Sequence, residues 1–216
     1  EYRVFSYFYF RNVLGLILLL LSIYLIKKDN KLFILSAAFL GGIHRPTFLI
    51  FGISYFIYTI TSKNKIKNIL YGIAILVLTA PFYLEHLREL LLDEITPLIT
   101  ANIGAGTFLS FTQYQFYSLI YLPFGLIGIF YLLKNRKFDL ITISFILLFI
   151  IVYFKIIFYN RFLIHLDIFM IILAGVGLYK IIESRIKLGY LALTLLLVSG
   201  FFISITYAIK PQSLID

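Results

Sequence analysis

The feature that most constrains the fold is an interruption of the apolar run from Leu32 to Ile60. Read as one helix, this run would be about 43 Å long at ~1.5 Å per residue, whereas the hydrocarbon core of a bilayer is about 30 Å thick. His44 and Arg45 would then lie near its middle, where an arginine is costly. Pro46 removes a backbone donor and disfavours helix at the preceding residue. The run therefore predicts two short helices joined by a turn at one face of a membrane.

Apolar runs recur along the whole chain, which is 62% hydrophobic and 13% charged. This composition is typical of an integral membrane protein and predicts the all-α class, a polytopic transmembrane helical bundle. The absence of cysteine excludes disulfides and thiol chemistry. The net charge of +9 is explained by basic loops on the cytoplasmic side, so no nucleic acid partner is expected. Because the chain begins at Glu1 and its one methionine is Met170, it is expected to be a fragment of a longer protein, with residues 1–216 forming a single transmembrane domain.

The distribution of basic residues predicts the membrane topology. Most of the 19 Lys and Arg residues lie in four clusters, at 27–31, 63–67, 134–137 and 180–187. The positive-inside tendency places all four clusters on the cytoplasmic side. This requires two crossings between the first and second clusters, so the turn at 44–46 is a hairpin tip on the opposite side. The expected spans are Val13–Ile26, Leu32–Ile43, Thr47–Ile60, Ile69–Phe82, Phe116–Leu133, Leu140–Phe154, Phe162–Tyr179 and Leu188–Ala208.

The sequence thus predicts about eight membrane crossings, including the short-helix hairpin at 32–60, in the plasma membrane of a prokaryote. Both ends of the chain are then outside. Residues 83–115 and 155–161 are extracytoplasmic as well, like the turn at 44–46, while the basic loops are cytoplasmic.

This topology brings all three histidines of the chain to the extracytoplasmic side. Arginine beside histidine at a membrane boundary suits a phosphate group, because the guanidinium fork matches the phosphate oxygens. A lipid phosphate bound there would lie at the headgroup level with its tail between helices. The alternative for each boundary arginine is a snorkelling anchor. The candidate residues for binding lipid phosphate or substrate are His44, Arg45, Arg161, His165 and Asp167.

Asp167 differs from the other candidates because it lies about one and a half turns into a predicted span, roughly 9 Å along the helix axis. A carboxylate at that depth is costly unless it is paired, protonated or faces a cavity. Arg161 and His165 share one face of the helix. Asp167 points away from His165, so the two need not be partners. It is therefore either a functional carboxylate or one member of an interhelical hydrogen bond.

Residues 83–115 form the one long polar insertion, and a loop of this length is usually functional or mobile. Its first residues carry leucines on one side, which predicts an amphipathic helix lying in the membrane plane. Glu85 and Glu89 share a face of that helix, and their carboxylates could hold Mg²⁺ or Mn²⁺. A solvated acidic face, partly neutralised by Arg88, is the favoured interpretation. No other cofactor is assigned.

Five short segments carry a resemblance to a known family. They are Arg11–Leu16, Gly41–Thr47, Gly106–Ser110, Asn160–Leu163 and Leu173–Leu178. Together they resemble the polytopic membrane glycosyltransferases of the C superfamily (GT-C), in particular archaeal and bacterial members, and more distantly the oligosaccharyltransferase catalytic subunit and protein mannosyltransferases. The resemblance implies an inverting transferase of the cell envelope. It would take a sugar from a polyprenyl- or dolichyl-phosphate carrier on the extracytoplasmic face, with the external basic residues holding the carrier phosphate among membrane lipids.

The resemblance also implies a catalytic Asp or Glu in the first external loop. That loop would lie upstream of Glu1, so the catalytic residue itself is unknown. The chain contains no Trp and hence no Trp-Trp-Asp motif, which argues against the oligosaccharyltransferase subunit.

Two other functions stay open. An O-antigen-type polymerase or ligase also uses external arginines and a long external loop to act on lipid-linked glycans. A transporter or flippase would predict inverted repeats and helices broken at mid-membrane. The charge distribution instead places the break at residues 44–46 at a surface, and Asp167 is the only charge in the central spans, which argues against transport.

Overall fold

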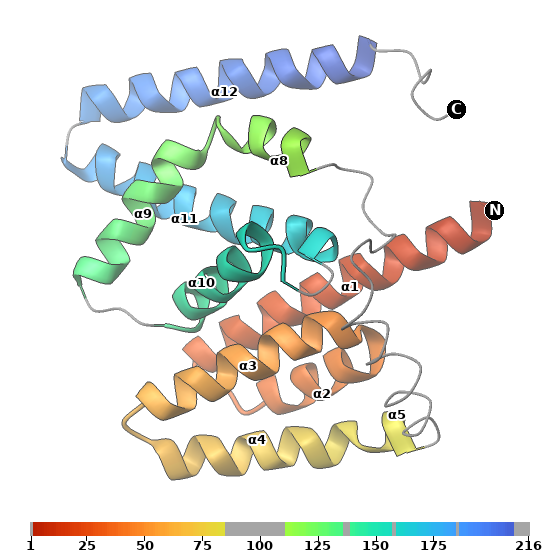
Figure 1. Cartoon of the computed structure of the whole chain (residues 1–216). Helices are drawn as coiled ribbons and strands as arrows, with labels where there is room; N and C mark the ends of the chain where they lie inside the picture. Colours follow the sequence, from red (N-terminus) through yellow and green to blue (C-terminus); the bar gives the residue numbers. More distant parts are fainter. Residues whose placement is uncertain (1, 85–110, 136–138, 157–158, 185, 210–216) are drawn as a thin grey trace. The chain divides into compact units, whose positions relative to one another are not determined.

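The computed structural model describes residues 2–84, 111–135, 139–156, 159–184 and 186–209 (Figure 1). Throughout these ranges the regular elements are helices and none is a strand, which confirms the all-α class. The elements are α1 (Tyr2–Lys27), α2 (Phe33–Ile43), α3 (Arg45–Thr61), α4 (Lys65–Thr79), α5 (Pro81–Leu84), α8 (Phe111–Ser118), α9 (Leu122–Lys134), α10 (Leu140–Tyr153), the 3-10 helix η2 (Tyr159–Phe162), α11 (Leu163–Ser184) and α12 (Ile186–Ile209). The amphipathic helix and the metal ligands predicted at Glu85 and Glu89 lie outside the described residues.

The helices group into two compact units. Unit 1 comprises Glu1–Gly106 and Phe138–His165, and unit 2 comprises Thr107–Lys137 and Leu166–Asp216. The boundary falls in the first turn of α11, so that helix contributes residues to both units. The single transmembrane domain expected from the sequence stays a prediction.

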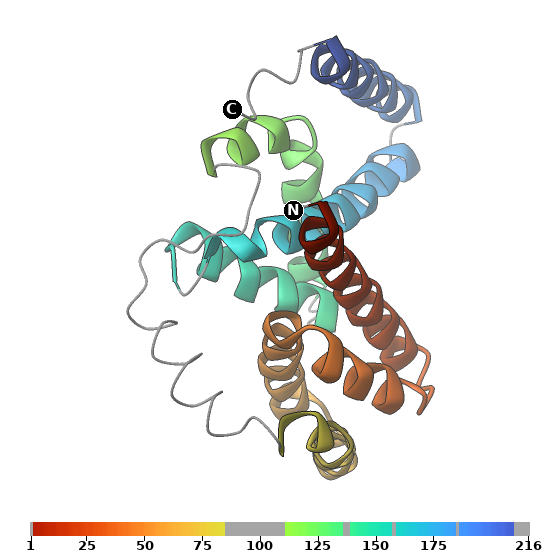
Figure 2. The ribbon, with the colours of Figure 1, turned by 90° about the vertical axis from the view of Figure 1, so that its right-hand side faces the viewer.

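In unit 1, the helices α1 to α4 run alternately in opposite directions (Figure 1). At one end, Lys67 Nζ lies 3.0 Å from Asp29 Oδ1, which ties the first turn of α4 to the loop that follows α1. At the other end, the Tyr83 hydroxyl donates to the Gly41 carbonyl at 2.9 Å, which ties α5 to the last turn of α2. Figure 2 views this end, where α2 gives way to α3. Apolar side chains that are fully buried, including Leu19, Leu40, Ile50 and Leu148, form the core of the unit.

The break between α2 and α3 falls at His44, whose backbone is extended with φ −143° and ψ 92°. Pro46 occupies the first turn of α3, where its missing N–H removes no helical hydrogen bond. Leu32–Ile60 is therefore divided where the sequence predicted, although α3 begins at Arg45. Helix α2 has 11 residues and α3 has 17, so they are about 16 and 25 Å long at ~1.5 Å per residue.

A second break was not predicted. The expected span Phe116–Leu133 is divided into α8 and α9 by a turn at residues 119–121, and Pro123 lies in the first turn of α9. Proline disfavours helix at the residue before it and cannot donate to the preceding turn. The same physical rule that divides the run at Pro46 therefore applies here, and the sequence interpretation overlooked it.

Unit 2 contains an unusually close approach of two helices. A Cβ placed on Gly128 of α9 would lie 2.0 Å from the Leu173 carbonyl oxygen, and one on Gly177 of α11 would lie 2.0 Å from the Phe124 carbonyl oxygen. These contacts are to backbone atoms, so α9 and α11 touch backbone to backbone. Small residues at such contacts are typical of helix packing in membranes.

Two helical stretches, Phe10–Lys27 and Tyr159–Ser184, are long and apolar enough to cross a membrane. Shorter apolar helices cover Phe33–Ile43, Leu122–Lys134, Leu140–Tyr153 and Gly189–Gly200. The total of eight crossings stays a prediction.

Candidate functional site

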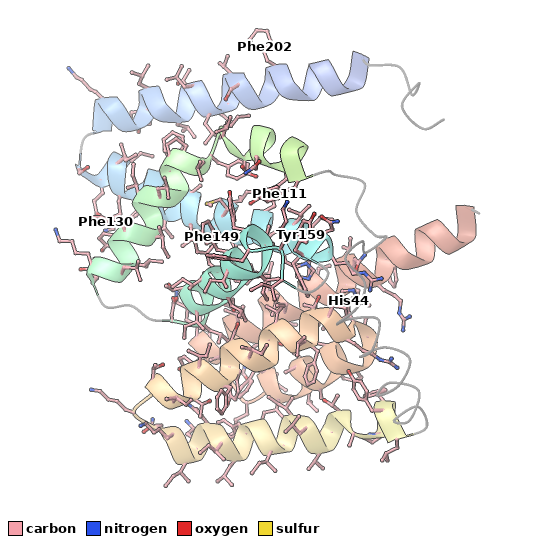
Figure 3. All side chains as sticks on the ribbon, viewed as in Figure 1. His44, Phe111, Phe130, Phe149, Tyr159 and Phe202 are labelled. Atoms are coloured by element: carbon pink, nitrogen blue, oxygen red, sulfur yellow. The ribbon has the colours of Figure 1, made fainter. Side chains whose placement is uncertain are left out.

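A buried threonine joins two histidines at the α2–α3 break. Thr47, in the first turn of α3, is fully buried. Its Oγ1 atom lies 2.5 Å from Nδ1 of His44 and 2.6 Å from Nε2 of His165. The two imidazole rings are nearly parallel, with centroids 6.2 Å apart and an interplanar angle of 15°. Figure 3 shows His44 at the end of the paired helices α2 and α3.

The second histidine is enclosed by protein. His165, in the first turn of α11, is 2% exposed. Its ring meets Phe162 edge-on at a centroid distance of 5.7 Å. Its Nδ1 atom is buried and makes no hydrogen bond of good geometry to the described residues. The backbone carbonyl of Arg161, one helical turn earlier, also acts on the ring.

Two arginines stand beside this pair. Gly15 of α1 lies so close to His44 that an added Cβ would be 2.7 Å from the His44 Cβ. Arg11 is one helical turn before Gly15 on the same face of α1. Arg161 is likewise one turn before His165. Both arginines are exposed, and both lie close enough to His44 for their charges to act on its imidazole, although they come from opposite ends of unit 1 in the sequence.

The pKa of His44 is affected by this arrangement. Burial, together with the charges of Arg161 and Arg11, lowers the pKa of His44 from 6.5 to about 4. Burial disfavours the charged imidazolium, and neighbouring cations disfavour it further. His44 is therefore a neutral imidazole at pH 7, accompanied by two cationic side chains.

The structure brings together three of the five predicted binding residues, His44, Arg161 and His165. Arg45 lies at the same break, with its guanidinium carbon 5.3 Å from the centroid of the Tyr83 ring. This is a cation–π contact, and the Tyr83 hydroxyl is itself fixed by the Gly41 carbonyl. The Arg45 guanidinium group therefore stacks on the ring of Tyr83 in α5.

Asp167, the fifth predicted binding residue, lies in unit 2. Its Oδ1 atom accepts a hydrogen bond from the hydroxyl of Tyr121, the residue that precedes α9. This contact matches the alternative interpretation of Asp167, an interhelical hydrogen bond that partners a carboxylate inside an apolar helix.

The sequence interpretation missed Arg11 and Thr47. Thr47 follows His44 at a spacing of three, which places it in the first turn of a helix that begins after His44. Arg11 and Gly15 are spaced by four, so a small residue exposes the backbone of α1 one turn from a guanidinium group. Both spacings can be read from the sequence, but which residues they bring into contact depends on the helix that packs against them. In the ranges the structure describes, no three His, Cys, Asp or Glu side chains are grouped to hold a metal ion.

Two guanidinium groups beside a neutral imidazole can bind an anion. Arginine matches phosphate oxygens with paired N–H donors. A neutral imidazole offers one donor and one acceptor nitrogen, so it can also exchange a proton with a bound group. Comparison of the chain with protein-family models, curated proteins and solved structures finds no match.

Proposed function

We propose that this chain is part of a GT-C-like membrane glycosyltransferase that takes a sugar from a polyprenyl- or dolichyl-phosphate carrier and transfers it to an acceptor on the extracytoplasmic face. The observation that carries the proposal is the convergence of Arg11 and Arg161 on the neutral His44 at one end of an apolar helical unit. The carrier phosphate binds the guanidinium groups of Arg11 and Arg161, while Arg45 at the same helix break stacks on Tyr83.

The exposed surface of the helices supports a membrane location. On α4, Ile66, Leu70, Leu76 and Val77 are each at least 60% exposed. On α12, Leu195, Leu197 and Phe202 are also each at least 60% exposed. Figure 3 shows the Phe202 side chain directed away from the helix. In water such apolar surfaces are unfavourable, whereas in lipid tails they are solvated.

The position of the basic residues supports a lipid-linked anion over a free one. The break at His44 ends two apolar helices, and Arg11 lies close to the start of the apolar stretch Phe10–Lys27. A phosphate bound at these residues would leave its lipid tail free to lie along apolar helix surfaces. The sugar-transfer step is suggested by the resemblance of Gly41–Thr47 and the other segments to GT-C enzymes.

The experiment is binding of a polyprenyl phosphate to the protein in lipid nanodiscs. Losing one charge-assisted contact costs roughly 1.5–3 kcal/mol, so Arg11→Gln and Arg161→Gln should each weaken binding about ten- to a hundred-fold. Lys63→Gln removes one charge from the exposed opposite end of unit 1 and is the matched control. Wild-type affinity in both arginine variants, with normal folded yield, would show that these residues are membrane anchors and would overturn the proposal.

A further inference from the structure

Two serines differ from the other buried hydroxyls of the described helices. Ser54 in α3 and Ser144 in α10 are fully buried, and neither hydroxyl has a hydrogen-bond partner among the described residues. Thr59 and Thr79, which are also buried, each donate to the carbonyl four residues earlier, at 2.8 and 2.7 Å. That bond is the usual one for a hydroxyl inside a helix. A hydroxyl without a partner is costly in an apolar interior, so Ser54 and Ser144 need a partner of another kind.

The two serines lie at similar levels within one pair of helices. Helices α3 and α10 pack against each other and run in opposite directions (Figure 1). Helix α10 also packs against η2, which leads into His165, and His165 bonds to Thr47 in the first turn of α3. The beginning of α3 and the end of α10 therefore lie at the same end of unit 1. Ser54 is seven residues from Thr47, about 10 Å along the helix axis, and Ser144 is nine residues from the end of α10, about 14 Å.

The faces of the two helices also agree with a shared site. Residues seven apart lie on nearly the same face of a helix, so Ser54 shares the face that Thr47 turns toward His165. On α10, Ser144, Leu148 and Val152 are spaced by four and are all fully buried, so they form one inward row. Helix α3 and η2 are the elements that pack most extensively on α10, and η2 leads to its end, so this row meets α3 at Ser144.

We propose that a water molecule binds between α3 and α10 and bridges the hydroxyls of Ser54 and Ser144. Water suits this position because it both donates and accepts hydrogen bonds, as each hydroxyl does. A buried water usually makes about three hydrogen bonds, and helix carbonyls, which keep a second lone pair, add to the two hydroxyls. Serine is smaller than the leucine and valine of the same row, which leaves room for it. An ion is a poorer occupant, since neither serine has a charge to offset its desolvation.

The bridge is the water-mediated counterpart of a direct bond in the same unit. Ser22 of α1 donates to Ser36 of α2 at 2.9 Å. Hydroxyl bonds of this kind hold helices together in lipid, where apolar side chains contact lipid tails as well as they contact each other. The proposed bridge joins residues 90 positions apart and holds against α3 the helix that leads to His165. It does not depend on the proposed transferase function.

The first test is magic-angle-spinning NMR of the wild-type protein in liposomes, with ¹³C-labelled serine and magnetisation transferred from water. The Cβ signals of Ser54 and Ser144 should build up several times faster than those of Ser22 and Ser36. The second pair is the matched control, because those serines are also buried but bond directly to each other. Equally slow transfer to all four serines would overturn the inference.

The second test is a double-mutant cycle on the unfolding equilibrium in detergent. Ser54→Ala and Ser144→Ala should each raise the unfolding equilibrium constant about three- to tenfold, because the water loses one partner. The double variant should unfold no more readily than either single variant, since the first replacement already removes the bridge. Ser22→Ala and Ser36→Ala provide a reference cycle, in which a direct bond gives the same kind of coupling.

Two results of the cycle would contradict the bridge. Alanine variants that are as stable as the wild type, or more stable, would mean that the hydroxyls are buried without partners. Effects that multiply in the double variant would mean that each serine bonds within its own helix. The NMR measurement uses the wild type, so it decides the inference even where an alanine variant does not fold. A failure of polyprenyl phosphate binding would bear on the proposed function alone.

Discussion

At the scale of single residues, His44 takes part in most of the interactions at the candidate site. Its backbone ends α2, its Nδ1 contacts Thr47, its Cβ contacts Gly15, and its pKa is lowered by burial and two arginines. A neutral imidazole among cations is not a stabilising ion pair. Its interactions are instead the hydrogen bond to Thr47 and the ring contact with His165.

The low pKa of His44 predicts a dependence of stability on pH. The unfolded state, with a pKa of 6.5, binds more protons than the folded state, with a pKa of about 4. Stability therefore rises with pH across this window, is fully present above pH 6.5 and is lost as the pH falls to 4. The difference of about 2.5 between the two pKa values corresponds to about 3 kcal/mol.

The measurement is denaturant unfolding in detergent between pH 4 and 7.5, comparing the wild type with His44→Gln. We expect a flatter profile in the variant by about this amount. The groups that act on His44 in the wild type, namely Arg11, Arg161, Thr47 and His165, are present in both proteins. Parallel profiles would mean that His44 does not titrate between the folded and unfolded states.

Gly15 provides a steric test of the same site. Because an alanine Cβ would lie 2.7 Å from the His44 Cβ, Gly15→Ala must push the ring from Thr47, at a cost of about 1–3 kcal/mol. We expect weaker polyprenyl phosphate binding and lower stability. Gly52→Ala in α3 of the same unit is the control, since nothing lies within 4 Å of its added Cβ. Equal behaviour of the two variants would place His44 farther from α1 than the structure has it.

At the scale of helices, the contact between α9 and α11 sets the geometry of unit 2. Gly125, Gly128 and Gly177 bring these helices together, and Gly125 faces the sulfur of Met170. A side chain such as the Met170 thioether can move to make room, whereas a carbonyl in a helix cannot without moving the helix. The backbone contacts at Gly128 and Gly177 are therefore the less tolerant ones.

This contrast predicts the effect of alanine along one helix. Gly177→Ala and Gly128→Ala should each lower the free energy of unfolding by about 1–3 kcal/mol or more, because the added methyl group meets a backbone carbonyl. Gly175→Ala, two residues away in α11, should be neutral, since nothing lies within 4 Å of its added Cβ. Thermal unfolding in a single detergent compares the three. A tolerated Gly177→Ala would contradict the close approach.

The apolar helices could mostly be anticipated from the sequence, although the division between α8 and α9 was not, and the contacts between helices could be anticipated only in part. Pro46 located the first break because proline acts on its own neighbours. The Thr47–His165 bond could not be read from the chain, because 118 positions separate its partners and only packing brings them together. The position of Arg11 near His44 could not be read from the chain for the same reason, since it depends on α1 lying against His44.

At the scale of the whole chain, the alternation of α1 to α4 within unit 1 agrees with the distribution of basic residues. The ion pair between Asp29 and Lys67 puts the two basic clusters 27–31 and 63–67 at one end of the unit. The Tyr83–Gly41 hydrogen bond puts the His44 break and the end of α5 at the other. Charge clusters that alternate with apolar runs are thus consistent with the alternating directions of α1 to α4, although they did not indicate which helices are neighbours.

The last prediction concerns the sides of the membrane to which these two ends belong. Because the chain has no cysteine, single-cysteine variants give an unambiguous signal with a membrane-impermeant thiol reagent. Lys31→Cys and Lys63→Cys should react from the cytoplasmic side, and Leu84→Cys and Lys155→Cys from the other. All four side chains are exposed, so failure to react reflects the side and not burial.

The hairpin at 32–60 makes this outcome specific. If α2 and α3 together formed one crossing, Lys31 and Lys63 would lie on opposite sides, and their cysteine variants would react from different sides. If they form two crossings, both react from one side and Leu84→Cys from the other. Only the second result puts Arg11, His44 and Arg161 at the extracytoplasmic face, where a lipid-linked sugar donor would meet them.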